Sequence, residues 1–330
     1  MQGPGIPPGP FFRSLHFGGS MPRKQSGSRY VEVTDRIIEA LQKGVVPWER
    51  PWVTGQPRNA ETGRRYRGIN RLLLDFTALE RGYSSPGWLT YAAARRLGGF
   101  VKRGETGTLC IYYERFEKQR EAEPSWDQEV DRQYLYLAKH FFLFNLDQIE
   151  GLEALRTSFA GLFASQPHDA VAEEILARPT ATIRYGGDHA AYSPGTDEIV
   201  LPVREAFPSS EAFYSTAYHE LGHWTGHHTR LDRPLTGRFG DAEYAQEELI
   251  AELTSAFLCA QAGLNVVSQS ASYIDSWIQV LSRDCRAIFV AAREAQAAAD
   301  FILGEWEPEV LPATAIGVDA PRDGSVAVAL

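Results

Sequence analysis

The sequence predicts an α+β fold of two domains, a small α+β domain followed by a mostly helical domain with a short sheet. Its 330 residues suit about two domains of roughly 150 residues each. Helical and strand patterns are mixed in residues 30–152, whereas residues 153–306 carry mainly helical patterns. The net charge also changes sign along the chain. We therefore expect a domain boundary between residues 152 and 153.

Charge is distributed unevenly along the chain, whose formal net charge is −9. Residues 22–120 contain 19 Lys and Arg against 10 Asp and Glu, and residues 121–330 contain 13 against 32. A basic part joined to an acidic part indicates that the basic part meets a polyanion. A charge imbalance that is merely solvated is the alternative.

The composition excludes several classes of protein. Hydrophobic residues make up 44% and charged residues 23% of the chain, as in ordinary soluble proteins. No apolar run approaches the roughly 20 residues that span a bilayer, and the N-terminus shows no secretory signal. Cys110, Cys259 and Cys285 form no CxxC pair, which argues against a disulfide framework or a thiolate metal site. We therefore expect a cytoplasmic protein that makes no contact with a membrane.

Both ends of the chain differ from its middle. Residues 1–29 are rich in Gly, Pro and Ser and lack periodicity, which predicts a disordered leader. Residues 307–330 are rich in Pro, Ala and Gly and predict a disordered tail. Met1 and Met21 are both candidate start residues.

Hydrophobic periodicity predicts the elements of the first domain. The first helix has an apolar face that includes Ile37 and Leu41, and Gly44 is its expected end. Alternating patterns predict two strands with a charged loop over residues 117–133 between them. The expected helices cover residues 30–44, 69–82 and 85–99, and the strands cover 106–118 and 133–145.

The second domain is predicted to be mostly helical. Residues 153–178 carry helical patterns, and two strands follow at 180–187 and 190–202, the second with a turn at Ser193–Thr196. The remaining expected helices cover residues 210–224, 242–262 and 272–303.

Residues 219–223 read His-Glu-Leu-Gly-His, which predicts a metal site. Positions i and i+4 share one face of a helix, so His219 and His223 can bind one metal ion. Glu220 is then placed to act as a general base toward a water molecule at that ion. A pair of buried, hydrogen-bonded histidines is the alternative.

Local sequence does not supply a third ligand. A histidine six residues after His223 would extend the motif, but that position is Thr229. His227 follows His223 by four residues, yet Gly226 is expected to end the helix and turn it away. We expect His228 to be a surface residue.

Glu248 and Glu252 are better candidates, because they are spaced i, i+4 on a strongly apolar helix. Two like charges at that spacing repel, and an unpaired buried carboxylate is costly. We favour Glu248 as the third ligand, with Glu252 accepting a hydrogen bond from a ligand histidine or acting as the alternative ligand. A solvated acidic helix face is the competing interpretation. The donor set favours one divalent cation, Zn²⁺, with an open coordination position.

The basic first domain is predicted to bind nucleic acid. Aromatic side chains interleaved with arginines suit single-stranded DNA, because bases stack on rings while cations follow phosphates. Trp48 and Trp52 could instead lie in the core, Arg95 and Arg96 at a solvated helix end, and Lys102 and Arg103 in a turn. The candidates for DNA binding are Trp48, Trp52, Arg64, Arg65, Tyr66, Arg67, Asn70, Trp88, Lys102 and Arg103.

The second domain resembles a known family. Residues 219–223 followed by Glu248-Leu-Ile-Ala-Glu252 have the layout of gluzincin-type metallopeptidases. The stretches AYSPGTDEIVLP, YHELGHWTGHHTRLDR and YAQEELIAELTSAFLCA are similar, in this order, to the zincin-like domain of ArdC-type antirestriction proteins. The resemblance implies a zincin-like fold in which a strand borders the substrate cleft. TDEIVLP is the candidate strand, with Tyr192 and Asp197 near the rim.

The first domain resembles the same family. LQKGVVPWERPW, NAETGRRYRGINRLLL, GWLTYAAARRLGGFVKRGETGTLCIYY and FFLFNLDQIEGL are similar to its single-stranded-DNA-binding domain, which is shared with TraC-type conjugative primases. Both resemblances together cover roughly residues 30–305. They imply a protein of mobile DNA that protects this DNA from host restriction endonucleases, with single-stranded DNA and a host restriction component as expected partners. A DNA-targeted zinc metallopeptidase and a non-catalytic module with a structural metal are the alternatives.

Overall fold

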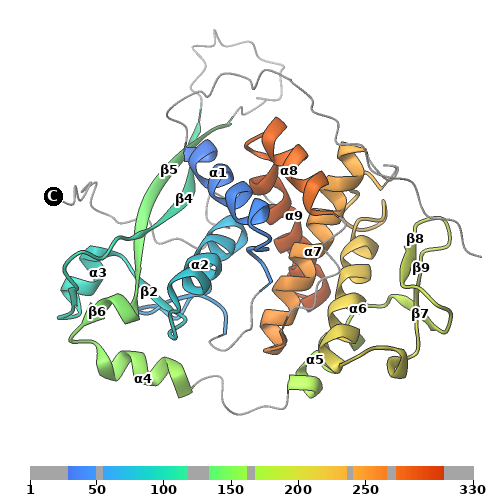
Figure 1. Ribbon diagram of the computed structural model, residues 1–330, viewed down its shortest axis with the longest axis horizontal. Helices are drawn as coiled ribbons and strands as arrows, with labels where there is room; N and C mark the ends of the chain where they lie inside the picture. The colour runs from blue at the N-terminus through green and yellow to red at the C-terminus, as the bar shows by residue number, and fades with distance from the viewer. Residues whose placement is uncertain are drawn as a thin grey trace, which may run out of the picture.

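Helices form the centre of the molecule, and strands lie at both sides of them (Figure 1). This computed structural model describes residues 29–49, 55–117, 134–161, 168–235, 241–265 and 273–307. Trp52 and residues 118–133 of the expected loop lie outside the described residues. The expected leader, except Arg29, and the expected tail, except Glu307, lie outside them as well.

Two of the helices expected in the first half are confirmed, as is the pair of strands. Helix α1 covers Arg29–Gln42 and α2 covers Gly68–Arg81, where Gly82 adopts a left-handed φ of 65° and ends the helix. Strands β4 (Thr108–Glu117) and β5 (Tyr134–Asn145) form a long antiparallel pair. Buried side chains from α2 and from this pair share one cluster, which includes Leu74, Cys110, Phe141 and Leu143.

The helix expected over residues 85–99 is only partly correct. Residues Gly87–Leu89 form strand β2, and helix α3 is limited to Tyr91–Arg96. The side chain of Thr90 accepts a hydrogen bond from the Ala93 amide, which fixes the start of α3. A side chain at Gly87 would approach Leu146 Cδ1 to 2.5 Å, so close packing selects glycine there.

Short elements complete the first half. Strand β2 pairs with β1 (Arg58–Asn59) in parallel and with β5 antiparallel, which gives a sheet of order β1-β2-β5-β4. Strand β3 (Phe100–Val101) pairs with β6 (Ile149–Glu150) after the 3₁₀ helix η1 (Leu146–Gln148). Helix α4 covers Glu153–Gly161.

The second half contains a small sheet beside a group of helices. Strand order is β7-β9-β8, with β7 at Thr182–Tyr185, β8 at Ala191–Ser193 and β9 at Glu198–Leu201. This confirms the two strand segments expected there and the turn between β8 and β9. The helices are α5 (His168–Ala177), η2 (Arg204–Ala206), α6 (Ser210–Thr225), α7 (Ala242–Ala262), α8 (Ile274–Arg283) and α9 (Ala287–Leu303).

The single helix expected over residues 272–303 is wrong. Asp284 has extended backbone angles and separates α8 from α9. Its side chain accepts a hydrogen bond of 2.8 Å from the Arg286 amide. Asp competes in this way with helical hydrogen bonds, so a local side-chain contact explains the break.

One hydrophobic cluster spans both halves of the chain. Trp48 follows α1 and packs edge-on against Trp277 of α8, with the two ring centroids 5.2 Å apart. Arg71 of α2 is buried, donates to the Phe257 carbonyl at 2.9 Å and lies over the Phe257 ring. Arg67 forms an ion pair with Asp300 of α9. The two halves are therefore packed together, and the boundary at residue 152 stays a prediction.

The structure gives no sign of a membrane-spanning segment within its described residues. None of the described helices combines the length and apolar character needed to cross a membrane.

Candidate metal centre

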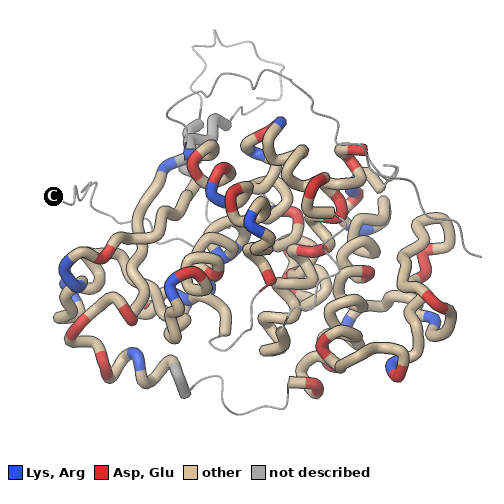
Figure 2. The backbone as a smooth tube through the Cα atoms, in the orientation of Figure 1, with Lys and Arg blue, Asp and Glu red and all other residues tan. Residues whose placement is uncertain are grey.

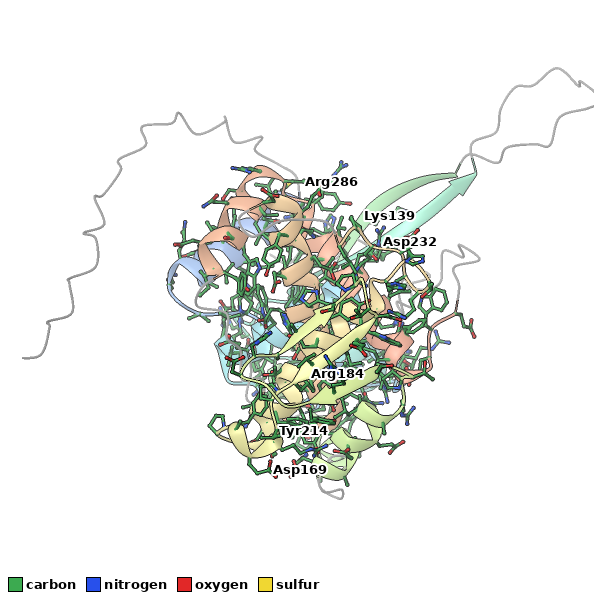
Figure 3. The ribbon with its side chains drawn as sticks, turned by 90° about the vertical axis from the view of Figure 1, so that its right-hand side faces the viewer. Lys139, Asp169, Arg184, Tyr214, Asp232 and Arg286 are labelled. Carbon is green, nitrogen blue, oxygen red and sulfur yellow. The ribbon has the colours of Figure 1, made fainter. Side chains whose placement is uncertain are left out.

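Helix α6 carries the His-Glu-Leu-Gly-His motif and is fixed at its start. Ser209 caps the helix by accepting a hydrogen bond from the Ala212 amide. The Tyr214 hydroxyl bonds Glu173 of α5 at 2.9 Å, and the Tyr218 hydroxyl donates to the Ala172 carbonyl at 2.8 Å. Figure 3 shows Tyr214 and Asp169 close together at the lower end of the molecule, below the sheet that carries Arg184. These contacts hold α6 against α5.

Three potential metal ligands meet between α6 and α7. One ligand atom from each of His219, His223 and Glu248 lies within 4.8 Å of the others. The Nε2 atoms of the two histidines are 3.1 Å apart, and Glu248 Oε2 is 3.4 Å from His219 Nε2. Glu248 Oε1 is 3.7 Å from His223 Nε2. Ligands of a tetrahedral zinc ion at about 2.1 Å are separated by about 3.4 Å, so the donors fit such an ion.

Carboxylates also lie behind the two histidines. Glu252 Oε1 lies 3.7 Å from His219 Nδ1, and Glu247 Oε1 lies 3.2 Å from His223 Nδ1. The Arg233 guanidinium contacts both Glu247 oxygens, at 2.8 and 3.0 Å. Carboxylates in this position orient an imidazole and leave Nε2 free to bind a metal ion.

Sequence reasoning considered Glu252 in this orienting position but missed Glu247 and Arg233. Glu247 directly precedes Glu248, and neighbouring side chains on a helix point about 100° apart. This spacing was the sequence feature that could have indicated a second orienting carboxylate. Arg233 lies in the loop after α6 and gave no comparable signal.

Electrostatics make the donor group attractive to a cation. Burial lowers the pKa of His219, but the carboxylates of Glu248, Glu252 and Glu220 outweigh this effect and raise it to about 9. Burial raises the pKa of Glu248, but the two histidines hold it below its ordinary value. The donors therefore stabilise positive charge between them.

Glu220 lies next to the donors and faces open space. Its side chain is 7% exposed and lines a cleft of about 530 Å³ that opens over the donor group. Among the described residues, its carboxylate makes no hydrogen bond or ion pair. Tyr244 and Tyr273 line the same cleft, and their hydroxyl oxygens are 3.4 Å apart. Sequence reasoning missed these two tyrosines.

Of the stretch TDEIVLP, which was expected to border the cleft, only Pro202 is among the described lining residues. Strand β9 is the central strand of its sheet and pairs with β7 on one side and β8 on the other. Its backbone hydrogen bonds are therefore already made. Strand β8 lies at the edge of the sheet, and its residues Ala191 and Tyr192 line the cleft.

Tyr192 and Asp197 have different surroundings. Among the described residues, the cleft lining includes Tyr192 but not Asp197. The Tyr192 hydroxyl donates to Asp197 at 2.9 Å, and Arg230 also donates to both Asp197 oxygens. Asp197 therefore holds Arg230 and Tyr192 beside the cleft.

His227 and His228 lie outside the donor group found among the described residues. The Nδ1 atom of His227 is 2.8 Å from the Thr229 hydroxyl, and His228 is exposed. That neither residue binds the metal stays a prediction.

Four of the residues expected to contact DNA are buried in this structure. Trp48, Tyr66, Trp88 and Asn70 are at most 3% exposed. Packing and internal hydrogen bonds occupy these side chains, which argues against their contact with DNA, and for Trp48 the burial agrees with the alternative of a core position. Trp88 packs edge-on against Tyr83, and the Asn70 amide bonds both backbone groups of Ile111.

The expected cationic residues are at or near the surface. Arg64, Lys102 and Arg103 are exposed, although the Lys102 ammonium donates to the Asp147 carbonyl at 2.8 Å. Arg65 and Arg67 are half-buried and face acidic side chains of the second half. Their partners are Glu305, at 4.0 Å from Arg65, and Asp300.

A row of aromatic side chains and one arginine, here called the aromatic strip, lies on the surface of the first half. Tyr91 is 48% exposed, Phe100 55% and Phe142 43%. The Tyr91 ring contacts Phe144, and the Arg95 guanidinium lies 4.3 Å above the Phe100 ring. The strip consists of Tyr91, Arg95, Phe100, Phe142 and Phe144. Figure 2 shows Lys and Arg positions around α3, which contributes Tyr91 and Arg95.

Sequence reasoning missed the aromatic members of this strip. For Phe142 the signal was the alternation along β5, where its neighbours Phe141 and Leu143 are buried and Phe142 is exposed.

Two family models match the chain. The N-terminal domain of anti-restriction factor ArdC matches residues 28–144, and a zincin-like metallopeptidase model matches residues 170–294. Two proteins of Escherichia coli, both DNA primases TraC, are 39% and 38% identical over 314 and 297 residues. These matches cover 89% and 84% of this chain but only 29% and 20% of the primases, so the chain spans less than a third of their length.

Two crystal structures of the antirestriction ArdC protein from the R388 plasmid are also similar. The metal-free structure has a TM-score of 0.69 and 37% identity, with 86% of this chain and 100% of that chain covered. The Mn(II)-bound structure has a TM-score of 0.65 and 36% identity, with 84% and 98% covered. The likeness thus extends over both halves.

Proposed function

The chain belongs to the ArdC family of antirestriction proteins, and from this premise we propose that it binds single-stranded DNA and protects mobile DNA from host restriction endonucleases. The observation that carries the proposal is the combination, in one chain, of an exposed aromatic strip with cations and a donor group for a metal ion. This combination occurs in the two regions that match the two family models.

DNA would lie on the aromatic strip. Exposed rings can stack on bases of any sequence, and Arg95 can add a cation–π contact. Lys102 and Arg103 follow Phe100 closely in the chain and would contact phosphates. Arg64 is exposed and extends the set of cations. In this proposal the exposed rings of the strip, and not the buried Trp48 and Trp88, stack on DNA bases, while the cations contact phosphates.

His219, His223 and Glu248 would bind one divalent metal ion, with Glu252 and Glu247 orienting the two imidazoles. Two histidines and one carboxylate favour Zn²⁺. The R388 ArdC protein has been solved with Mn(II), so Mn²⁺ is the competing ion. Metal analysis of protein purified without added metal would identify the ion.

A second candidate function is a metallopeptidase that cleaves a host protein or a DNA-bound protein. A bound ion would polarise a peptide carbonyl and lower the pKa of a water molecule. Glu220 would take the proton from that water as general base, and the Tyr244 and Tyr273 hydroxyls could donate to the developing oxyanion. The carboxylate of Glu220, which lines the open cleft and forms no ion pair within the described part of the chain, favours this candidate.

A purely structural metal is less favoured. Structural zinc sites are usually closed by four protein ligands, whereas three donors meet here among the described residues.

The decisive comparison uses Glu220→Gln in a plasmid-transfer assay with restricting and non-restricting recipients. Wild-type protein should raise transfer selectively into the restricting host. If it does not, the proposed antirestriction function is wrong. Full protection by Glu220→Gln with normal metal content would show that peptide hydrolysis is not how restriction is blocked. Loss of protection with metal and DNA binding intact would support the second candidate.

A further inference from the structure

The cleft above the metal ligands is lined by acids and by no lysine or arginine among the described residues. Its acidic residues are Asp188, Glu220, Glu243, Glu247, Glu248 and Glu252. A bound divalent ion would offset only two of these negative charges. The cleft therefore keeps a negative potential when the metal is bound.

Nearby arginines do not reverse this charge. Arg233 is buried and neutralises Glu247 from behind. Arg230 is held by Asp197 and lies over the Trp224 ring at 4.0 Å. Neither arginine is among the described lining residues, and each pairs with a carboxylate of the protein.

A buried and unpartnered carboxylate marks the cleft as a ligand site. Glu220 is more than nine-tenths buried at 7% exposure, and its carboxylate has no hydrogen bond or ion pair in the part of the chain that the structure describes. Because it lines the open cleft, this carboxylate can complete its contacts with a molecule bound there.

Two of the lining carboxylates are exposed and come from different parts of the chain. Glu243 belongs to the first turn of α7. Asp188 precedes β8, is 97% exposed and lies 2.8 Å from the Nδ1 atom of His189, which also lines the cleft. Apolar side chains, including Phe207 and Leu235, also line the cleft. Long basic side chains suit this mixture, because their methylene stems contact apolar groups while their charged ends reach carboxylates.

We propose that the metal cleft binds a polypeptide segment rich in Lys and Arg and excludes nucleic acid, with Asp188 and Glu243 determining this specificity. The inference rests on the proposed peptidase-like site and names its substrate class. DNA phosphates would meet uncompensated negative charge in the cleft, whereas the aromatic strip offers cations. Single-stranded DNA and the polypeptide therefore occupy different sites on one chain.

The test measures peptide binding to metal-loaded full-length Glu220→Gln protein, which should bind without turnover. Three fluorescent peptides of equal length carry lysines and arginines, aspartates and glutamates, or neutral polar residues at the same positions. Anisotropy titrations should show at least about tenfold tighter binding of the basic peptide than of the acidic one. Adding Asp188→Asn and Glu243→Gln should weaken basic-peptide binding about threefold to tenfold and leave neutral-peptide binding unchanged.

The matched control adds Glu205→Gln and Asp275→Asn, which change the net charge equally but lie outside the described cleft lining. This control should retain basic-peptide affinity. Equal binding of acidic and basic peptides, no peptide binding, or an equal effect of the control pair would each overturn the inference. DNA protection, measured separately on wild-type protein, tests the proposed function. If the protein protects DNA but does not prefer the basic peptide, the inference is wrong and the proposed function is retained. If it prefers the basic peptide but does not protect DNA, the proposed function is wrong and the inference is retained.

Discussion

Gly222 of α6 packs against Ala251 of α7. A Cβ added at Gly222 would stand 3.0 Å from the Ala251 Cα and 3.4 Å from its Cβ. Gly222 directly precedes His223, and Ala251 follows Glu248 by one helical turn. The absence of a side chain at one position therefore lets the two helices that carry the three proposed metal ligands approach closely.

Replacing Gly222 with alanine should weaken the metal site. The added methyl group meets backbone atoms, so α6 and α7 must separate by a few tenths of an ångström. Such overpacking costs about 1–3 kcal/mol in stability, and metal affinity should fall about tenfold. Calorimetric metal titration and thermal unfolding measure the two effects. Gly195→Ala is the control, because its Cβ would enter open space. Unchanged metal affinity in Gly222→Ala would show that this contact does not position the donors.

Removing the charge of Arg233 should destabilise the protein strongly. Arg233→Met removes the arginine partner of the buried Glu247 carboxylate and leaves His223 beside it, which costs about 3–5 kcal/mol. The double variant Arg233→Met with Glu247→Gln should recover part of this loss, because no unpaired charge remains. Urea unfolding measures the stability of each. Equal stability of the single and double variants would contradict a charge-pair role for Arg233.

Metal removal should lower stability through the donor group. A ligand present at 100 times its Kd adds about 2.7 kcal/mol to the free energy of unfolding. Chelation should therefore lower Tm, and the effect should vanish in His219→Ala. His228→Ala keeps the donor set and should retain the shift. A chelator-sensitive Tm in His219→Ala would place the metal elsewhere.

The metal motif could be read from sequence because its geometry is local. His219 and His223 are one turn apart in any helix, and the apolar pattern around Glu248 predicts the second helix. The structure brings these three residues together. Their ligand roles stay a prediction, which the variants above test.

The DNA-binding residues were harder to predict because burial depends on tertiary packing. Trp48 lies beside Arg50 in sequence, yet Trp277 of the second half covers it. Trp88 and Phe142 are both aromatic residues of the first half, but Trp88 faces the core and Phe142 faces solvent. The break at Asp284 depends on one side-chain hydrogen bond that helical periodicity does not encode.

Asp197 should contribute a small, pH-dependent stabilisation. Hydrogen bonds from Arg230 lower its pKa in the folded protein. A lowered pKa stabilises the fold at pH values above the unfolded value of about 3.9, and this contribution disappears as pH falls through the folded pKa. Asp197→Asn should therefore be less stable than wild type at pH 7, and this difference should disappear at a pH below the folded pKa of Asp197.

The size of the Asp197 effect should stay under about 1 kcal/mol, since this side chain is 39% exposed. Asn also tolerates the left-handed φ of 53° found at this position. Chemical unfolding at both pH values provides the measurement. A constant difference between the two proteins at all pH values would contradict the ion-pair explanation.

The aromatic strip should determine how binding to single-stranded DNA depends on salt and on ring stacking. Phe100→Ala removes an exposed ring and should weaken binding by about 1–3 kcal/mol with an unchanged salt slope. Lys102→Gln with Arg103→Gln should instead reduce the slope of log K against log salt by about 0.7 for each lost phosphate contact. Tyr185→Ala is the control, because Tyr185 is an exposed aromatic residue in the second half. Titrations with labelled oligonucleotides at several salt concentrations separate the two effects. If Phe100→Ala and Tyr185→Ala bind alike, bases do not stack on the strip.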